Sequence, residues 1–368
     1  MNPALAITLG NEPVEPRPVG VAVVGLGYWG PNLLRVLGDQ LDAEVRWMCD
    51  LDTDRLAKYR RRHPAARATT RIDRVLADPD VDAVLIATPV HTHHMLAAQA
   101  LAAGKHVFVE KPLAQSSELA DDLVALARER DLILMCGHTF LYSPPVRAVK
   151  RLIEAGTLGD IFFISSSRVN LGLHQRDVSV IWDLGPHDFS ILLYWLSELP
   201  TTVRAVGRDS IVKGIVDVAF VTMTFASGIV VNVELSWLAP SKLRRTVLVG
   251  SEQMVIYDDG APEPVRVFDR GVVYKDPETF GEYHLSYRSG DVISPRIESH
   301  EPLGLELADF VKAIQTDDQM ALNAAIARSV VRIAEAADES LLHGGREVSL
   351  DHSDIAAQLT APRELAAA

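Results

Sequence analysis

The sequence predicts an α/β chain with two domains. A doubly wound parallel sheet comes first, followed by an α+β domain with a large open, mainly antiparallel sheet. Short apolar runs alternate with helical patterns over residues 19–140, and a glycine-rich turn follows the first run. From residue 202 onward, strand-like runs follow one another without intervening helices. A chain of 368 residues is also longer than one core usually reaches, so two domains are expected.

The first domain, residues 19–140, alternates strands with helices. Nearly continuous apolar runs predict buried parallel strands over 21–24, 45–49, 83–88, 106–109 and 132–136. Apolar residues at three- and four-residue spacing predict helices over 31–37, 53–62, 71–77, 94–103 and 117–130. Gly104 can end the fourth helix, and Ser116 or Ser117 can begin the fifth. Repeated units of this kind form a parallel sheet with right-handed crossovers.

The second domain, residues 141–350, has a different pattern. We expect helices over 146–155, around 187–196, over 303–314 and over 321–342. Strands are expected over 161–169, 203–206, 216–225, 229–237, 246–249 and 265–268. Residues 1–18 include Pro13, Pro16 and Pro18 and resemble a flexible extension rather than a signal peptide, and residues 351–368 resemble a tail.

The composition bounds the class of protein. A net charge of −13 argues against non-specific nucleic-acid binding. The longest apolar stretches fall short of the roughly 18 to 20 residues that span a membrane. Two cysteines give no disulfide framework and favour a reducing compartment. We therefore expect a cytoplasmic protein that acts on neither membranes nor nucleic acid.

The glycine-rich turn at residues 25–30 predicts a dinucleotide site of the Rossmann type. Gly25 permits a tight turn, Gly27 lets the backbone approach a pyrophosphate, and Gly30 allows close packing of helix on strand. Asp50 ends the second strand, where a carboxylate can bind the ribose diol and repel a 2′-phosphate. The cofactor expected is NAD, with NADP less favoured, although Arg55 keeps NADP open. The alternative is a glycine-rich turn without a nucleotide.

Three residues predict the chemistry. Lys111 follows the fourth strand of the first domain, and Asp183 and His187 share one face if their segment is helical. A histidine can accept the proton of an alcohol near neutral pH, and a lysine can stabilise developing alkoxide charge. Taken alone, Asp183 and His187 are more often a pair on a helix surface.

A metal site at His91-x-His93-His94 is set aside. No cysteine or carboxylate accompanies these histidines at ligand spacing, so no metal is expected. The polarity of a helix start explains them, with a nicotinamide contact for His91.

Several motifs together resemble the glucose–fructose oxidoreductase/inositol dehydrogenase/rhizopine-catabolism (Gfo/Idh/MocA) family. They are the turn with its continuation to Asn32, Ala87-Thr-Pro89 with His91, Glu110-Lys-Pro112, and Asp183-x-x-x-His187. The resemblance runs from about residue 19 to about residue 350. It implies a Rossmann domain followed by an α+β domain whose open sheet commonly forms the interface of a homo-oligomer, here a dimer or tetramer.

The resemblance also implies roles for individual residues. Lys111 matches the substrate-contacting lysine, His187 the general base and Asp183 its acidic partner. Four side chains would lie beside the cofactor: Thr88, Pro89, His91 and Glu110. Tyr28 and Trp29 would contact it through their backbone.

Further stretches resemble family members that act on sugar nucleotides, namely residues 167–172 and 181–190. Arg168 and Asn170 are therefore expected to bind substrate, Arg168 by pairing with a diphosphate. A strand-end arginine in water is an equal alternative. Lys242, Arg244 and Arg245 flank a strand start and are more typical of a surface.

We thus expect an NAD-dependent dehydrogenase that oxidises a secondary ring hydroxyl, at C3, of a sugar that is nucleotide-linked. A free sugar, an inositol or a sugar phosphate is the alternative substrate. A non-catalytic NAD-binding sensor is the alternative from another class, and it would need none of Lys111, Asp183 and His187.

Overall fold

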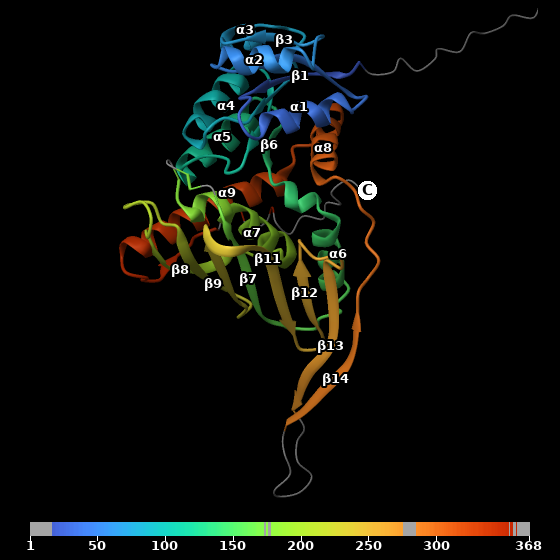
Figure 1. Ribbon diagram of the computed structural model, residues 1–368, viewed down its shortest axis with the longest axis vertical. Coiled ribbons are helices and arrows are strands. Elements are labelled where there is room, and N and C mark those ends of the chain that lie inside the picture. Colours follow the sequence, from blue (N-terminus) through green and yellow to red (C-terminus); the bar gives the residue numbers. More distant parts are fainter. Residues whose placement is uncertain are drawn as a thin grey trace, which may run out of the picture.

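The computed structural model describes residues 17–172, 174–175, 178–274, 285–352, 354–355 and 358. The expected extension at residues 1–18 and the expected tail at 351–368 lie almost entirely outside these residues. Two sheets are stacked along the long axis of the molecule, with helices α7 and α9 between them (Figure 1). Among the described residues, no helix is both long enough and apolar enough to span a membrane.

The first sheet has six parallel strands in the order β3-β2-β1-β4-β5-β6. This is the order of a Rossmann fold, so the predicted class is correct. The strands are β1 (Val19–Val24), β2 (Ala43–Cys49), β3 (Arg67–Thr69), β4 (Ala83–Ile86), β5 (His106–Glu110) and β6 (Leu134–Gly137). Strand β3 was not predicted, because three residues give no periodicity.

Helices cover both faces of this sheet. They are α1 (Gly30–Gly38), α2 (Thr53–Arg60), α3 (Ile72–Leu76), α4 (His93–Ala102) and α5 (Ser117–Glu129), with the 3₁₀ turns η1 (Val90–Thr92) and η2 (Thr139–Tyr142). The Ser116 hydroxyl accepts from the amide of Leu119 and begins α5, as predicted.

The second sheet has nine strands in the order β14-β13-β12-β11-β7-β10-β9-β8-β15. All neighbours are antiparallel except β7 and β10. The strands are β7 (Ile161–Leu171), β8 (Pro200–Arg208), β9 (Val218–Phe225), β10 (Val230–Ser236), β11 (Leu238–Gly250), β12 (Met254–Asp258), β13 (Val265–Tyr274), β14 (Leu285–Ile293) and β15 (Val348–Ser349). Buried residues alternate along β9 and β10, so one face meets the helices.

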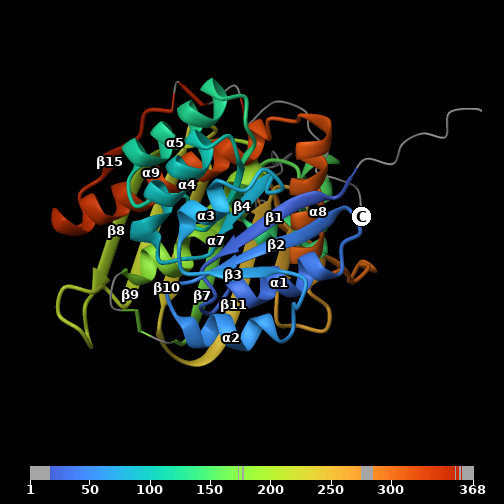
Figure 2. The ribbon, with the colours of Figure 1, turned by 90° about the horizontal axis from the view of Figure 1, so that it is seen from above.

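Four helices complete the chain: α6 (Pro144–Glu154), α7 (Val180–Leu196), α8 (Pro302–Thr316) and α9 (Ala321–Leu342). Helix α7 begins seven residues before the predicted start, because its first half contains Pro186, which masks the helical pattern. Figure 2 shows the first sheet lying over the second, with α8 beside α1. The chain thus returns to its first half after building the second sheet.

Candidate active site

The glycine turn lies between β1 and α1 and has the shape that a dinucleotide needs. Gly25 has φ +91°, and a Cβ there would lie 2.6 Å from the carbonyl oxygen of Ala87. A Cβ on Gly27 would meet only Arg55, 3.7 Å away, so the turn is open on that side. The start of α1 adjoins this opening with the positive end of its dipole, while Pro31 has no amide hydrogen and the Asn32 amide donates to the Trp29 carbonyl oxygen at 2.8 Å. The turn therefore fits a pyrophosphate.

Asp50 lies beside the turn at the end of β2. Its carboxylate accepts the amide of Leu26 at 2.5 Å and the amide of Asp52 at 2.8 Å. Arg55 lies 3.8 Å from the same carboxylate and 3.3 Å from that of Asp52. Arg55 is thus engaged by two carboxylates, and negative charge at this position favours a ribose diol over a 2′-phosphate.

The loop after β4 contains the Thr88-Pro89 pair, followed by His91 on η1. The Thr88 hydroxyl lies 2.7 Å from that of Thr92, while His91 is exposed. The ring of His93 is 1% exposed, and its two nitrogens lie 2.8 Å from the carbonyl oxygens of Thr88 and Pro112. His93 therefore joins the loops at the carboxyl ends of β4 and β5, a role that its sequence position did not indicate.

Lys111 and Asp183 meet across the two halves of the chain. The Lys111 ammonium donates to the carbonyl oxygen of Asp183 at 2.8 Å and lies 3.5 Å from its carboxylate. The indole of Trp237 donates to the same carboxylate at 3.0 Å. The Lys111 side chain is one-fifth exposed, so it is partly open to solvent while Asp183 holds its end. The structure thus brings together two of the three residues predicted for the chemistry.

His187, the third, lies one helical turn after Asp183 on α7 and is partly buried. Its ring packs edge-on against Phe140, with centroids 5.1 Å apart. Burial lowers the pKa of His187 well below 6.5, and the charges of Lys111 and Arg168 lower it further. The imidazole is therefore neutral near pH 7 and can accept a proton.

Arg168 is not a solvated strand-end arginine. Its guanidinium pairs with Asp188, and both side chains are 4% exposed. The guanidinium carbon lies 4.6 Å from the centroid of the Phe140 ring, and Nη1 is buried with no partner among the described residues. A contact of Arg168 with a diphosphate stays a prediction.

Asn170 lies further along β7, next to the residues that hold Asp183. A Cβ on Gly172 would lie 2.8 Å both from Asn170 Oδ1 and from Trp237 Cδ1. Asn170 Oδ1 is buried and has no hydrogen-bond partner in the described part of the chain. The free acceptor of Asn170 lies beside Trp237. Substrate binding by Asn170 stays a prediction.

Arg244 corrects an expectation. Lys242 and Arg245 are exposed, but Arg244 is half-buried, with its guanidinium carbon 5.5 Å from the Phe140 centroid and an ion pair to Asp259 at 2.9 Å. The register of β11 on β7 places it opposite Arg168, a pairing that no local pattern reveals.

Glu110 ends β5 directly before Lys111 and is 9% exposed. Burial raises its pKa to about 8, although the neighbouring Lys111 charge acts in the opposite direction. Tyr28 is 88% exposed and stacks on the partly buried Trp29, with ring centroids 6.4 Å apart. These residues line the same edge of the first sheet, where open α/β sheets bind ligands.

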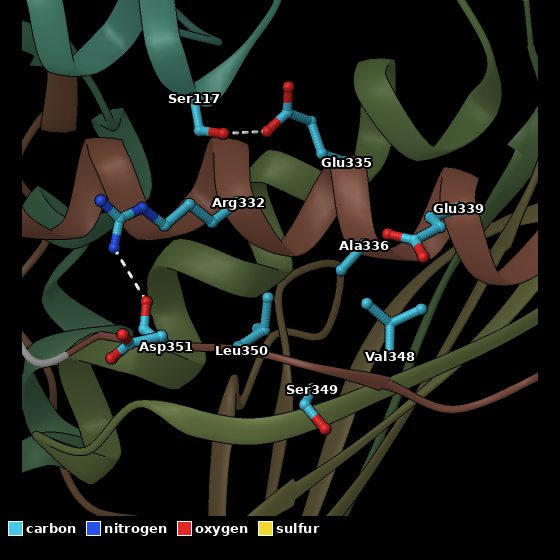
Figure 3. Close-up of a pocket in the computed structure, with 9 residues that line it drawn as sticks. All are labelled: Ser117, Arg332, Glu335, Ala336, Glu339, Val348, Ser349, Leu350 and Asp351. Carbon is cyan, nitrogen blue, oxygen red and sulfur yellow. Dashed lines mark hydrogen bonds between the residues drawn. The ribbon is translucent and has the colours of Figure 1, made fainter.

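A separate pocket of about 450 Å³ lies where α9 meets β15 (Figure 3). Ser117 of α5 contacts Glu335 there, and Arg332 donates to the carbonyl oxygen of Asp351 at 3.0 Å. None of the residues expected to carry the chemistry lines it. The pocket is therefore distinct from the candidate active site.

Comparisons with known proteins cover both halves of the chain. Residues 19–138 match the model of an oxidoreductase family with an NAD-binding Rossmann fold. Residues 146–256 match the C-terminal domain of the Gfo/Idh/MocA family.

Individual relatives carry defined activities. A UDP-N-acetylglucosamine 3-dehydrogenase of Acidithiobacillus ferrooxidans is 35% identical over 49% of this chain and 55% of its own length. A myo-inositol 2-dehydrogenase of Thermotoga maritima is 29% identical over 56% of this chain and 65% of its own length. The crystal structure of GenD2 from gentamicin A biosynthesis, in complex with NAD, superposes with a TM-score of 0.77 at 28% identity. That similarity covers 91% of this chain and 97% of GenD2.

The order of strands, the glycine turn and the two family matches agree with one another. The cofactor is NAD, and the chain is an oxidoreductase. The chain belongs to the Gfo/Idh/MocA family of oxidoreductases.

Proposed function

We propose that this protein oxidises a secondary ring hydroxyl, at C3, of a nucleotide-linked sugar. The observation that carries the proposal is the contact of Lys111 with Asp183, one helical turn from a neutral His187. Similarity to a UDP-N-acetylglucosamine 3-dehydrogenase supports the choice of substrate, as do the buried Arg168 and the partly buried Asn170, each of which has a buried polar atom without a partner among the described residues.

Each of the three residues has a separate task in the proposed reaction. The Lys111 ammonium binds the reacting oxygen and stabilises its developing negative charge. His187 accepts the hydroxyl proton, which its low pKa allows because the imidazole is neutral before the reaction. The Asp183 carboxylate, fixed by Trp237, keeps Lys111 in position.

The residues present fit the cofactor that this reaction needs. Bound NAD supplies the hydride acceptor. Gly25, Gly27 and the start of α1, with the backbone of Tyr28 and Trp29, would hold its pyrophosphate, and Asp50 its adenosine ribose. Residues on the loops after β4 and β5 would face the nicotinamide half: Thr88, Pro89, His91 and Glu110.

Replacing the base tests the mechanism. We expect His187→Ala to lower turnover by about 10²- to 10⁴-fold, because general base catalysis contributes that much. NAD affinity should be unchanged, which a fluorescence titration measures. His343→Ala, an exposed histidine at the end of α9, is the matched control. Unchanged turnover in His187→Ala would remove this residue from the mechanism.

The substrate is found by thermal-shift screening with NAD plus nucleotide sugars, inositols and sugar phosphates. A ligand that binds the folded state raises its stability with the logarithm of its concentration. The relative that oxidises myo-inositol keeps an inositol as the second candidate. Stabilisation by inositols and not by nucleotide sugars would select it, and no cofactor reduction with any of these compounds would support the sensor alternative.

We also propose that the protein is a cytoplasmic homo-oligomer, a dimer or tetramer. The face of the second sheet that lies away from the helices exposes apolar side chains: Phe163, Val206, Phe220 and Val230. An exposed apolar face of this kind favours association. Light scattering gives the mass in solution, and a monomer at micromolar concentration would contradict the proposal. Two buried cysteines with free thiols support a reducing compartment.

A further inference from the structure

Near Lys111, three titratable side chains from different parts of the chain are buried around residues 137–139. Glu110 ends β5, His138 follows β6, and Glu306 lies on α8. Their exposed fractions are 9%, 1% and 0%. The catalytic steps proposed above use none of their side chains, and ionisable groups are seldom buried so completely without a partner.

These side chains have unused hydrogen-bonding capacity. Four of their atoms make no hydrogen bond of normal geometry among the described residues, namely Glu110 Oε1, Glu306 Oε1 and both ring nitrogens of His138, although the Trp29 indole is close enough to Glu110 to lower its pKa. The remaining oxygens are engaged, since Glu306 Oε2 accepts from the Thr139 hydroxyl at 2.7 Å and Glu110 Oε2 from the Lys111 amide at 3.3 Å. Buried polar atoms of this kind are normally satisfied, and water or a proton is the ligand that suits them.

The lack of a side chain at Gly137 leaves room for the Glu110 carboxyl group. A Cβ on Gly137 would lie 3.3 Å from Glu110 Oε2 and 3.0 Å from the Phe108 ring. In the described part of the chain, these side chains do not converge as the ligands of a metal ion would. Glu110 lies opposite Gly137 in the register of β5 on β6, directly before His138.

Burial and neighbouring charges both shift the pKa values of the cluster, so an additional charge placed nearby should shift them again. Burial raises the pKa of Glu306 well above 4.5, and the Glu110 carboxyl raises it further. Burial lowers the pKa of His138 to about 3, with Lys111 acting in the same direction. The other titratable groups that face the cluster come from β6, η2, α8, α6 and α7: Cys136, Tyr142, Asp309, Arg147 and His187.

We propose that Glu110, His138 and Glu306 form a buried proton-binding site whose occupancy is set by the charge of the nicotinamide cofactor. The proposal rests on the assignment of NAD as the cofactor and does not depend on which sugar is the substrate. Glu110 adjoins Lys111 at the carboxyl edge of the first sheet, where the nicotinamide half is expected.

The sign of the effect follows from electrostatics. Oxidised NAD carries a positive charge on its nicotinamide ring, and reduced NADH does not. A positive charge near a carboxyl group favours its ionised form. Binding of NAD⁺ should therefore expel a proton from the cluster that binding of NADH leaves in place.

Isothermal titration calorimetry with NAD⁺ and with NADH, without a sugar, tests the proposal. At a given pH, titrations in phosphate and in Tris give the number of protons released per cofactor bound, because the two buffers differ in ionisation enthalpy. At pH 8 we expect NAD⁺ to release about half a proton more than NADH. The double variant Glu110→Gln/Glu306→Gln should release the same number of protons on binding NAD⁺ as on binding NADH. Glu301→Gln, a half-exposed acid just before α8, is the matched control and should keep the wild-type difference.

A second variant keeps the test decisive if the double variant does not fold. Glu306→Gln retains an acceptor for Thr139 and leaves one carboxyl in the cluster. The difference in proton release between NAD⁺ and NADH should therefore be largest at a lower pH than in the wild type. Equal proton numbers for both cofactors in the wild type would overturn the proposal. So would an undiminished difference in the folded double variant, or an unmoved maximum in Glu306→Gln. Failure to bind either cofactor would instead contradict the proposed function.

Discussion

Asn323 on α9 connects the second half of the chain to the edge of the first sheet. It is 3% exposed, and its side chain accepts the amide of Cys136 at 2.8 Å and donates to the Cys136 carbonyl at 3.0 Å. Strand β6 is the last strand of the sheet, so this side chain supplies the bonds that a further strand would make. We predict that Asn323→Ala strongly destabilises the protein.

The magnitude follows from the two lost bonds. Each buried backbone group left without a partner costs about 1 to 3 kcal/mol, while alanine regains about 0.5 kcal/mol of helix propensity. The expected loss is therefore about 1.5 to 5.5 kcal/mol in the free energy of unfolding. Urea denaturation followed by circular dichroism measures it as a lower transition midpoint.

The control is Glu339→Ala, an exposed polar residue on the same helix, which should change stability by less than about 0.5 kcal/mol. A loss below about 1 kcal/mol for Asn323→Ala would refute the reasoning. It would mean that β6 keeps its backbone satisfied without α9.

Three further outcomes are expected. Gly25→Ala should abolish measurable NAD binding in a fluorescence titration, because its φ of +91° and the nearby Ala87 carbonyl exclude a Cβ; wild-type affinity would contradict this. Trp237→Phe should lower kcat by about tenfold with NAD affinity unchanged, because the Asp183 carboxylate loses its indole donor; an unchanged kcat would show that this bond is dispensable. Glu306→Gln should stabilise the fold increasingly above pH 4.5, by up to about 1.4 kcal/mol per pH unit, because the raised pKa means that the unfolded state ionises first. Denaturation at pH 5 and pH 8 measures this, and a pH-independent difference would contradict it.

Much of the first half was predictable because its signals are local. The glycine turn, the apolar strands and Asp50 each depend on a few consecutive residues. The resemblance placed Lys111 and Asp183 at one site and made Asp183 the partner of His187. It did not predict the direct contact of Asp183 with Lys111, which lies 72 positions away. Trp237, His93 and the buried cluster were missed because their roles arise when separate elements pack, and no periodicity records that.

The return of α8 and α9 to the first sheet has a consequence for protein engineering. Arg35 of α1 pairs with Glu301 just before α8, and Asn323 of α9 bonds to β6. A chimera that exchanges residues 19–138 alone would therefore replace the Arg35 side of the first connection and would require the new strand to meet Asn323 in register. Transplanting the cofactor specificity of another family member should succeed only if the donor's equivalents of α8 and α9 accompany its Rossmann segment. The unit of exchange is thus discontinuous in the gene, although it is contiguous in space.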